Sequence, residues 1–210
     1  KPLLEEIAAG KIPRGDMTPF QARRVRSFQN DALNDRLIAV WGQLRDTPAE
    51  KQRAIAKWKA ELLPSVMEVA DMSNGRKVFN KTCATCHRLY GYGDPVGLDL
   101  TGSSRNNLNF LLDNIVDPSA VVNADFQMRI VLLADGRTLN GLIASQSERT
   151  ITLKMQNETV VIDRSQIDEI EVSKLSLMPE GLLDSLTKSD ARDLIAYLMH
   201  PNQVPLSREK

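Results

Sequence analysis

Five consecutive residues constrain this chain more than any other feature. Both of its cysteines and one of its two histidines lie in the run Cys83-Ala84-Thr85-Cys86-His87. A disulfide framework would need more cysteines at longer spacings, and a structural zinc site needs four ligands, commonly arranged as two pairs. The fold is therefore expected to present two thiols and an imidazole from a single turn of backbone.

This spacing is the attachment signal for c-type haem. Two thiols three positions apart on a helical turn can reach the two vinyl groups of a porphyrin and form thioethers, and the next residue then lies under the iron. The motif predicts one covalently bound haem c, anchored by Cys83 and Cys86, with His87 as the proximal iron ligand. Three other interpretations remain: a thioredoxin-like dithiol, a zinc site that would use adjacent Cys86 and His87, and a chance occurrence of the motif.

An iron bound by His87 has a sixth coordination position, which cytochromes c commonly fill with methionine. Met178 is the candidate, because it lies in a predicted loop and precedes a proline that keeps it extended. A water-bound or open position and ligation by His200 are the alternatives. Met128, Met155 and Met199 fall in predicted strands or the last helix and are expected to be core or surface residues. The ligand is expected from a loop C-terminal to His87, and Met17, Met67 and Met72 precede it.

Composition excludes several classes of function. The chain has 210 residues, of which 42% are hydrophobic and 26% charged, as is ordinary for a folded soluble protein. Basic and acidic residues number 27 each, so no basic excess favours nucleic-acid binding. No apolar run approaches the ~20 residues of a membrane-spanning helix. The chain begins at Lys1 without a signal-like stretch, so we expect a mature form or an excised piece of an exported protein.

Residues 1–70 are predicted to form a helical segment, either the end of a helical repeat or a cap on the next domain. A helix is expected over Asp31–Trp41, where Leu33, Leu37, Val40 and Trp41 share one face. Thr47-Pro48-Ala49-Glu50 is a start signal for another helix, which Pro64 ends.

Residues 71–210 are predicted to form one haem domain, interrupted by a β insertion over 125–174. Its helices are expected from Ser73 to the motif, over Asn107–Ile115 and over Leu186–Met199, with Ser189 as a cap. Period-two alternation around the Asp135-Gly136 turn predicts five short strands, suggesting an SH3-like barrel or small rolled sheet. They span Gln127–Leu133, Thr138–Ala144, Thr150–Met155, Thr159–Ile162 and Ile167–Val172. The expected fold class is mainly α with an inserted β unit, hence α+β.

Residues 73–200 resemble a class I cytochrome c. Gly75 and Phe79 before the motif, with Leu194 and Tyr197 near the end, match the crossing of the first and last helices in that fold. The loop Gly97-Leu98-Asp99-Leu100-Thr101-Gly102 matches a family loop written Gly-Pro-x-Leu-x-Gly, with leucine in place of proline. The family's proline carbonyl accepts a hydrogen bond from the proximal histidine, and the resemblance implies this role for Leu98.

A closer resemblance is to the haem-binding domain at the C-termini of large planctomycete and verrucomicrobial proteins. The matching stretches are Phe79–His87, Val96–Gly102, Asn114–Val121, the Asp135-Gly136 hairpin, Leu177–Leu183 and Asp193–Leu198. In that family a β segment interrupts the cytochrome before the methionine loop. Such domains often follow helical repeats and a dehydrogenase-like propeller, which implies a periplasmic dehydrogenase context.

Several residues near the motif are candidate contacts of the haem. Tyr90 and Tyr92 could pack against its edge, Leu98 and Leu100 lie in the matching loop, and Arg105 could bind a propionate, with surface solvation as the alternative. No paired acid and base or nucleophile set is recognisable. We therefore expect an electron-transfer protein rather than an enzyme, with a redox protein or dehydrogenase module as partner. The alternative is a haem-based sensing or binding module with a labile or open sixth position.

Overall fold

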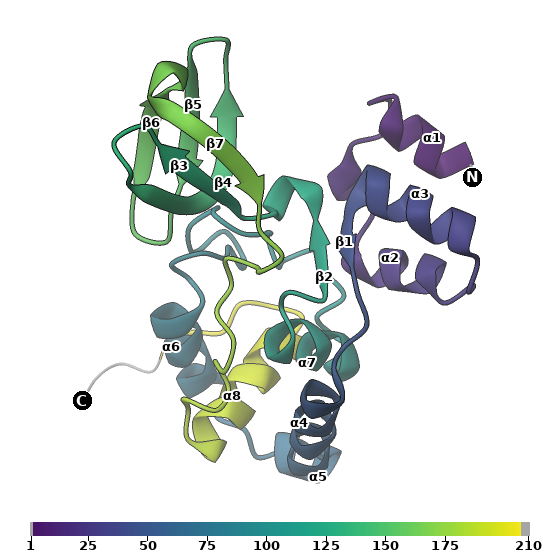
Figure 1. Ribbon diagram of the computed structural model, residues 1–210. Helices are drawn as coiled ribbons and strands as arrows, with labels where there is room; N and C mark the ends of the chain where they lie inside the picture. Colours follow the sequence, from purple (N-terminus) through teal and green to yellow (C-terminus); the bar gives the residue numbers. More distant parts are fainter. Residues whose placement is uncertain (1, 207–210) are drawn as a thin grey trace. The chain divides into compact units, whose positions relative to one another are not determined.

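The computed structural model describes residues 2–206 and combines helices with β-strands, so the chain is an α+β protein as predicted (Figure 1). Its residues form two compact units. The first contains the chain up to Arg45 together with Ser119–Met178, and the second contains Asp46–Pro118 together with the chain from Pro179 onward. No helix in the described range has the length and apolar character needed to cross a bilayer.

The first unit begins with short helices. They are α1 (Pro2–Ala8), the 3-10 turn η1 (Arg14–Asp16), α2 (Pro19–Arg26) and α3 (Asp31–Trp41). Thr18 caps the start of α2. The predicted apolar face of α3 is confirmed, since Leu37, Val40 and Trp41 are buried. The indole N–H of Trp41 donates to the carbonyl oxygen of Met17 at 2.7 Å, which satisfies its buried polar atom.

A small two-stranded sheet, which the hydrophobic pattern did not predict, follows α3. Strand β1 (Gly42–Leu44) pairs antiparallel with β2 (Val121–Asn123), and the 3-10 turn η2 (Ala124–Phe126) follows β2. The Gln43 side-chain amide adds a hydrogen bond of 2.6 Å to the carbonyl oxygen of Ser119. Strands this short contain too few residues for alternation to stand out from the flanking helices.

A larger antiparallel sheet completes the first unit. Its members are β3 (Arg129–Leu133), β4 (Thr138–Gln146), β5 (Thr150–Lys154), β6 (Thr159–Asp163) and β7 (Ile167–Val172), with the 3-10 turn η3 (Arg164–Gln166) before β7. Their order is β6-β5-β4-β3-β7. All five predicted strands are present. Alternate side chains form the core of this sheet, namely Val131, Leu133, Ile151, Leu153 and Ile162.

The second unit is helical in its described part. Its helices are α4 (Ala49–Glu61), α5 (Pro64–Met67), α6 (Met72–Thr82), α7 (Leu108–Val116) and α8 (Lys188–Met199). The expected boundary after residue 70 differs from this grouping. Helix α4 falls in the second unit because Ile55, Trp58 and Leu62 belong to the same hydrophobic core as Phe79.

Helices α6 and α8 cross at close range within the second unit. A Cβ atom on Gly75 would collide with the backbone carbonyl of Asp193, so the approach depends on glycine. The rings of Phe79 and Tyr197 pack beside this contact with their centroids 5.7 Å apart. The structure thus contains the helix crossing that the resemblance implied.

The buried carboxylate of Asp193 ties the start of α6 to α8. It accepts hydrogen bonds from the backbone N–H of Asp71 at 3.0 Å and from the Asn74 amide at 2.9 Å. Because this carboxylate is almost wholly buried, these donors replace the water that it loses.

The helix caps differ from the predicted ones by two residues. Asp71, rather than Ser73, caps α6, and Thr187, rather than Ser189, caps α8. In each case the side chain accepts the backbone N–H three positions later, as an N-cap does.

We predict that Gly75→Ala lowers the free energy of unfolding by about 1–3 kcal/mol, because the added methyl group forces the two helix backbones apart. Alanine is intrinsically the better helix former by about 1 kcal/mol, so a loss cannot come from helix propensity. Chemical denaturation followed by circular dichroism measures the change. Gly102→Ala is the matched control, since its methyl group meets no atom within 4 Å. Equal stability of the two variants would contradict the tight crossing.

Candidate functional site

The five-residue motif forms a tight turn at the C-terminal end of α6. Cys83 is the C-cap of this helix, and the backbone N–H groups of Cys86 and His87 both donate to its carbonyl oxygen, at 3.1 and 2.8 Å. Both cysteines are half-buried and are not joined in a disulfide. One turn therefore presents two thiols and an imidazole, as their spacing predicted.

A hydrogen bond to Leu98 orients the imidazole of His87. The ring nitrogen Nδ1 lies 2.8 Å from the carbonyl oxygen of Leu98. A carbonyl oxygen only accepts hydrogen bonds, so Nδ1 carries the proton. In the neutral ring the lone pair then lies on Nε2, which is the form that binds a metal.

The loop after the motif packs directly against this imidazole. The backbone N–H of Gly97 donates to the carbonyl oxygen of Cys86 at 2.7 Å, and the backbone N–H of Asp94 donates to the carbonyl oxygen of Ala84 at 2.8 Å. A Cβ atom on Gly97 would lie 2.7 Å from Cε1 and 3.0 Å from Nδ1 of His87. A larger residue at this position would therefore displace the ring. Reasoning from the sequence missed this contact, for which the glycine of the family loop was the available signal.

Burial shifts the pKa of two groups in the motif, the Cys83 thiol and the His87 imidazole. It raises the pKa of the Cys83 thiol to about 12, and the neighbouring Cys86 adds to the rise. Burial also lowers the pKa of His87, although its hydrogen bond with Leu98 acts in the opposite direction. A thioredoxin-like dithiol needs a thiol whose pKa is lowered, so this environment disfavours that interpretation. Across residues 2–206, no group of three or more His, Cys, Asp or Glu side chains is arranged to hold a metal ion.

Arg105 and Tyr90 bind the C-terminal end of α8. The buried guanidinium of Arg105 donates to the carbonyl oxygens of Leu198, at 2.7 Å, and of His200. The Tyr90 hydroxyl donates to the same carbonyl of His200, and its ring centroid lies 4.8 Å from the guanidinium carbon. A cation here also offsets the negative end of the helix dipole. In the described part of the chain, Arg105 keeps one buried donor without a partner, Nε.

The other predicted haem contacts differ in their surroundings. Leu98 supplies the carbonyl that binds His87, and Leu100 packs partly buried against the core of the second unit. The Tyr92 side chain is 48% exposed. Leu98 is thus the predicted neighbour with a direct contact to the imidazole.

Met178 lies in the loop after β7, as predicted, and is half-buried at the end of the first unit. Its backbone N–H donates to the hydroxyl of Ser176 at 3.1 Å, and the backbone N–H of Ser176 donates to the buried hydroxyl of Ser119 at 3.0 Å. Several of the other methionines pack in or against hydrophobic cores, namely Met17, Met67, Met155 and Met199.

Comparison with known families agrees with this geometry. The profile of the family Cytochrome c matches residues 72–201, which is more than half of the chain. The chain belongs to the cytochrome c family. The match includes the motif, the loop that packs on His87 and the crossing of α6 with α8.

Two curated relatives of this cytochrome are both named photosystem II extrinsic protein V. The protein from Synechococcus sp. (strain CC9605) is 37% identical over 81 residues, which covers 31% of this chain and 48% of the relative. The protein from Synechococcus sp. (strain CC9311) is 34% identical over 108 residues, which covers 42% of this chain and 61% of the relative. The chain therefore spans about half to three fifths of the length of these relatives.

The cofactor of a cytochrome c is a covalently bound c-type haem with iron, and the residues of this chain fit it. Cys83 and Cys86 offer two thiols that are not paired with each other, and His87 offers a lone pair on Nε2. When bound, the haem supplies a one-electron couple between ferric and ferrous iron. Cys83, Cys86 and His87 would hold and orient the group.

We predict that His87 of the haem-free protein is protonated at Nδ1 when neutral, and that Gly97→Ala weakens this preference. The added methyl group overlaps the ring and displaces it from the position in which Nδ1 meets the Leu98 carbonyl, the contact that favours this tautomer. Long-range 1H–15N spectra of the imidazole report the tautomer directly. Gly102→Ala, which adds a methyl group in open space, serves as the control. An Nε2-protonated ring in the unmodified chain would contradict the assignment.

Proposed function

We propose that this cytochrome transfers electrons through a haem attached by Cys83 and Cys86, with His87 as the proximal ligand. The observation that carries the proposal is the 2.8 Å contact between Nδ1 of His87 and the Leu98 carbonyl. It leaves Nε2 as the nitrogen for iron and increases the electron density on the ring. Residues that hold an iron ligand in one orientation keep the structural rearrangement small when the iron gains or loses an electron, which suits electron transfer.

Met178 is the proposed sixth ligand. Thioether sulfur stabilises ferrous iron, so a His/Met pair raises the reduction potential, as suits an electron carrier. The loop position supports this role, because the half-buried Met178 is not part of a hydrophobic core cluster in the described residues.

Hydrogen bonds within the first unit hold the backbone of the methionine loop. Met178 donates to Ser176, and Ser176 donates to Ser119. The Gln43 amide donates to the carbonyl oxygens of Ser119, at 2.6 Å, and of Lys174, at 2.9 Å. The loop is therefore tied to β1, and we infer that this tether limits the movement of the methionine.

The wider context is also part of the proposal. We assign an exported, periplasmic location, because covalent haem attachment takes place outside the cytoplasm, and the relatives are named as extrinsic proteins. The resemblance to the planctomycete-type domain supports a role as the C-terminal module or partner of a larger dehydrogenase-type protein. In that interpretation the sheet β3–β7 is an SH3-like insertion, which fits the return of β7 to pair with β3 after η3.

The decisive experiment compares the unmodified protein with Met178→Ala, both made in a host with the haem c maturation system. We expect a low-spin spectrum with the red charge-transfer band of methionine-bound ferric iron, and we expect the variant to lose that band. Its reduction potential is expected to fall on the order of 100 mV, within the ~0.8 V range that axial ligands span.

Met128→Ala is the matched control, since Met128 is also half-buried in the first unit. A high-spin spectrum of the unmodified protein, or a spectrum indifferent to Met178, would reject the His/Met assignment and favour a sensing or binding module with an open iron position. A protein without covalent haem would reject the attachment by Cys83 and Cys86.

We further predict that Ser176→Ala keeps the methionine band but makes the ligand easier to displace. Removing one hydrogen bond of about 1 kcal/mol loosens the loop, so added imidazole is expected to replace the methionine at roughly fivefold lower concentration. A spectrophotometric titration with imidazole measures this. Ser165→Ala removes a comparable turn hydroxyl, which bonds Asp163, and serves as the control. Equal midpoints for both variants would show that the tether is unimportant.

A further inference from the structure

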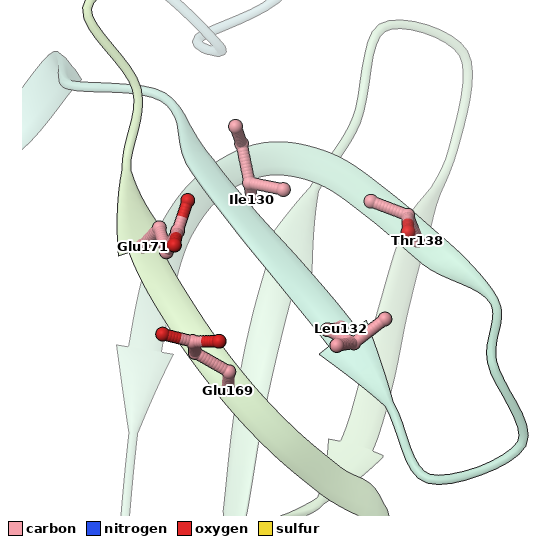
Figure 2. Close-up of a pocket in the computed structure, with 5 residues that line it drawn as sticks. All are labelled: Ile130, Leu132, Thr138, Glu169 and Glu171. Atoms are coloured by element: carbon pink, nitrogen blue, oxygen red, sulfur yellow. The ribbon is translucent and has the colours of Figure 1, made fainter.

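A shallow pocket of about 180 Å³ lies on the outer face of the five-stranded sheet. It is lined by Ile130, Leu132, Thr138, Glu169 and Glu171, which Figure 2 shows on β3, β4 and β7. The strand register explains the grouping, since Ile130 pairs with Glu171, while Leu132 pairs with Glu169 on one side and Thr138 on the other. Val131 points into the core between them, so this set faces the opposite side.

The pocket combines an apolar floor with a negative rim. Ile130 and Leu132 are half-buried on the floor, and Glu169 and Glu171 are exposed along the edge strand β7. Within residues 2–206 neither glutamate side chain forms a hydrogen bond or an ion pair, and β7 contains no basic residue. Both cross-strand neighbours on β3 are aliphatic, so the two carboxylates lie on one face without a compensating charge.

Two acidic side chains at turns of this sheet, Asp135 and Asp163, do have partners. Asp135 forms an ion pair with Arg137 at 2.8 Å, and Asp163 accepts hydrogen bonds from Ser165. Arg164 is turned toward the hairpin between β4 and β5, where it donates to Gln146 at 2.9 Å. Glu169 and Glu171 thus lack, among residues 2–206, the kind of partner that Asp135 and Asp163 have, and they lie beside the apolar floor of Ile130 and Leu132.

We propose that this pocket binds a lysine or arginine side chain on the surface of a protein partner. The aliphatic stem of such a residue packs on Ile130 and Leu132, while its charged end lies between the two carboxylates. A pocket of about 180 Å³ is smaller than the ~300–1,000 Å³ typical of small-molecule sites, which favours one inserted side chain over a free cofactor. Acidic residues also protect edge strands from pairing, but that role requires no apolar floor beside them.

The test uses the full-length, haem-loaded protein with labelled methyl groups and trilysine amide as the probe. We expect saturable shifts of the Ile130 and Leu132 methyl resonances. The double variant Glu169→Gln/Glu171→Gln is expected to weaken binding at least about fivefold, as loss of charge-assisted bonds does. A trinorleucine amide, which has the stems without the charges, is expected to cause no saturable shift.

The control variant Glu148→Gln/Glu158→Gln removes the same two charges from exposed turns of the same sheet. It is expected to change the affinity less than about twofold. Equal weakening in both double variants would show that the probe follows net charge alone. The proposal would be overturned if the probe shifted only resonances outside the pocket or caused no shifts. It would also be overturned if Glu169→Gln/Glu171→Gln bound the probe as before but self-associated. That result would identify edge protection as the role of the two glutamates.

Discussion

The backbone contact between Gly75 and Asp193 is the constraint on which the second unit depends. It sets how closely α6 and α8 approach, and α6 leads directly into Cys83. Residues before and after the motif then bind both ends of α8. The Asn74 amide donates to Asp190 in the first turn of α8, and Arg105 donates to the last carbonyl oxygens. The imidazole of the motif thus belongs to a rigid frame whose parts come from distant stretches of sequence.

Local features of the fold could be predicted from the sequence. The motif spacing, the strands of the five-stranded sheet and the apolar face of α3 depend on residues within one turn or one strand, where periodicity is informative. The role of the Leu98 carbonyl came from the resemblance, because the bond joins residues in different turns. A backbone carbonyl leaves no trace in residue type, so composition alone cannot reveal such a bond.

Long-range contacts account for what could not be predicted. The pairing of β1 with β2 joins two segments that are separated in sequence by Asp46–Pro118, the first part of the second unit. Arg105 has the residue type of a propionate ligand or a surface residue, and only the carbonyls at the end of α8 explain its burial. At the start of α6, Asp71 and Ser73 are both good N-caps, and the contact of the Asp71 backbone with Asp193 favours the earlier one.

The interleaving of the two units has a consequence for the order of folding. The chain passes between the units after Arg45, Pro118 and Met178, so α8 joins α6 only when the last stretch has been synthesised. Closing such a long loop costs entropy, but a folded sheet between α7 and α8 brings its own ends together and shortens the flexible path. Prior folding of β3–β7 therefore favours the docking of α8. Until α8 arrives, α6 lacks the helix that packs on it at Gly75, and the hydrophobic core against which Cys83 packs is incomplete.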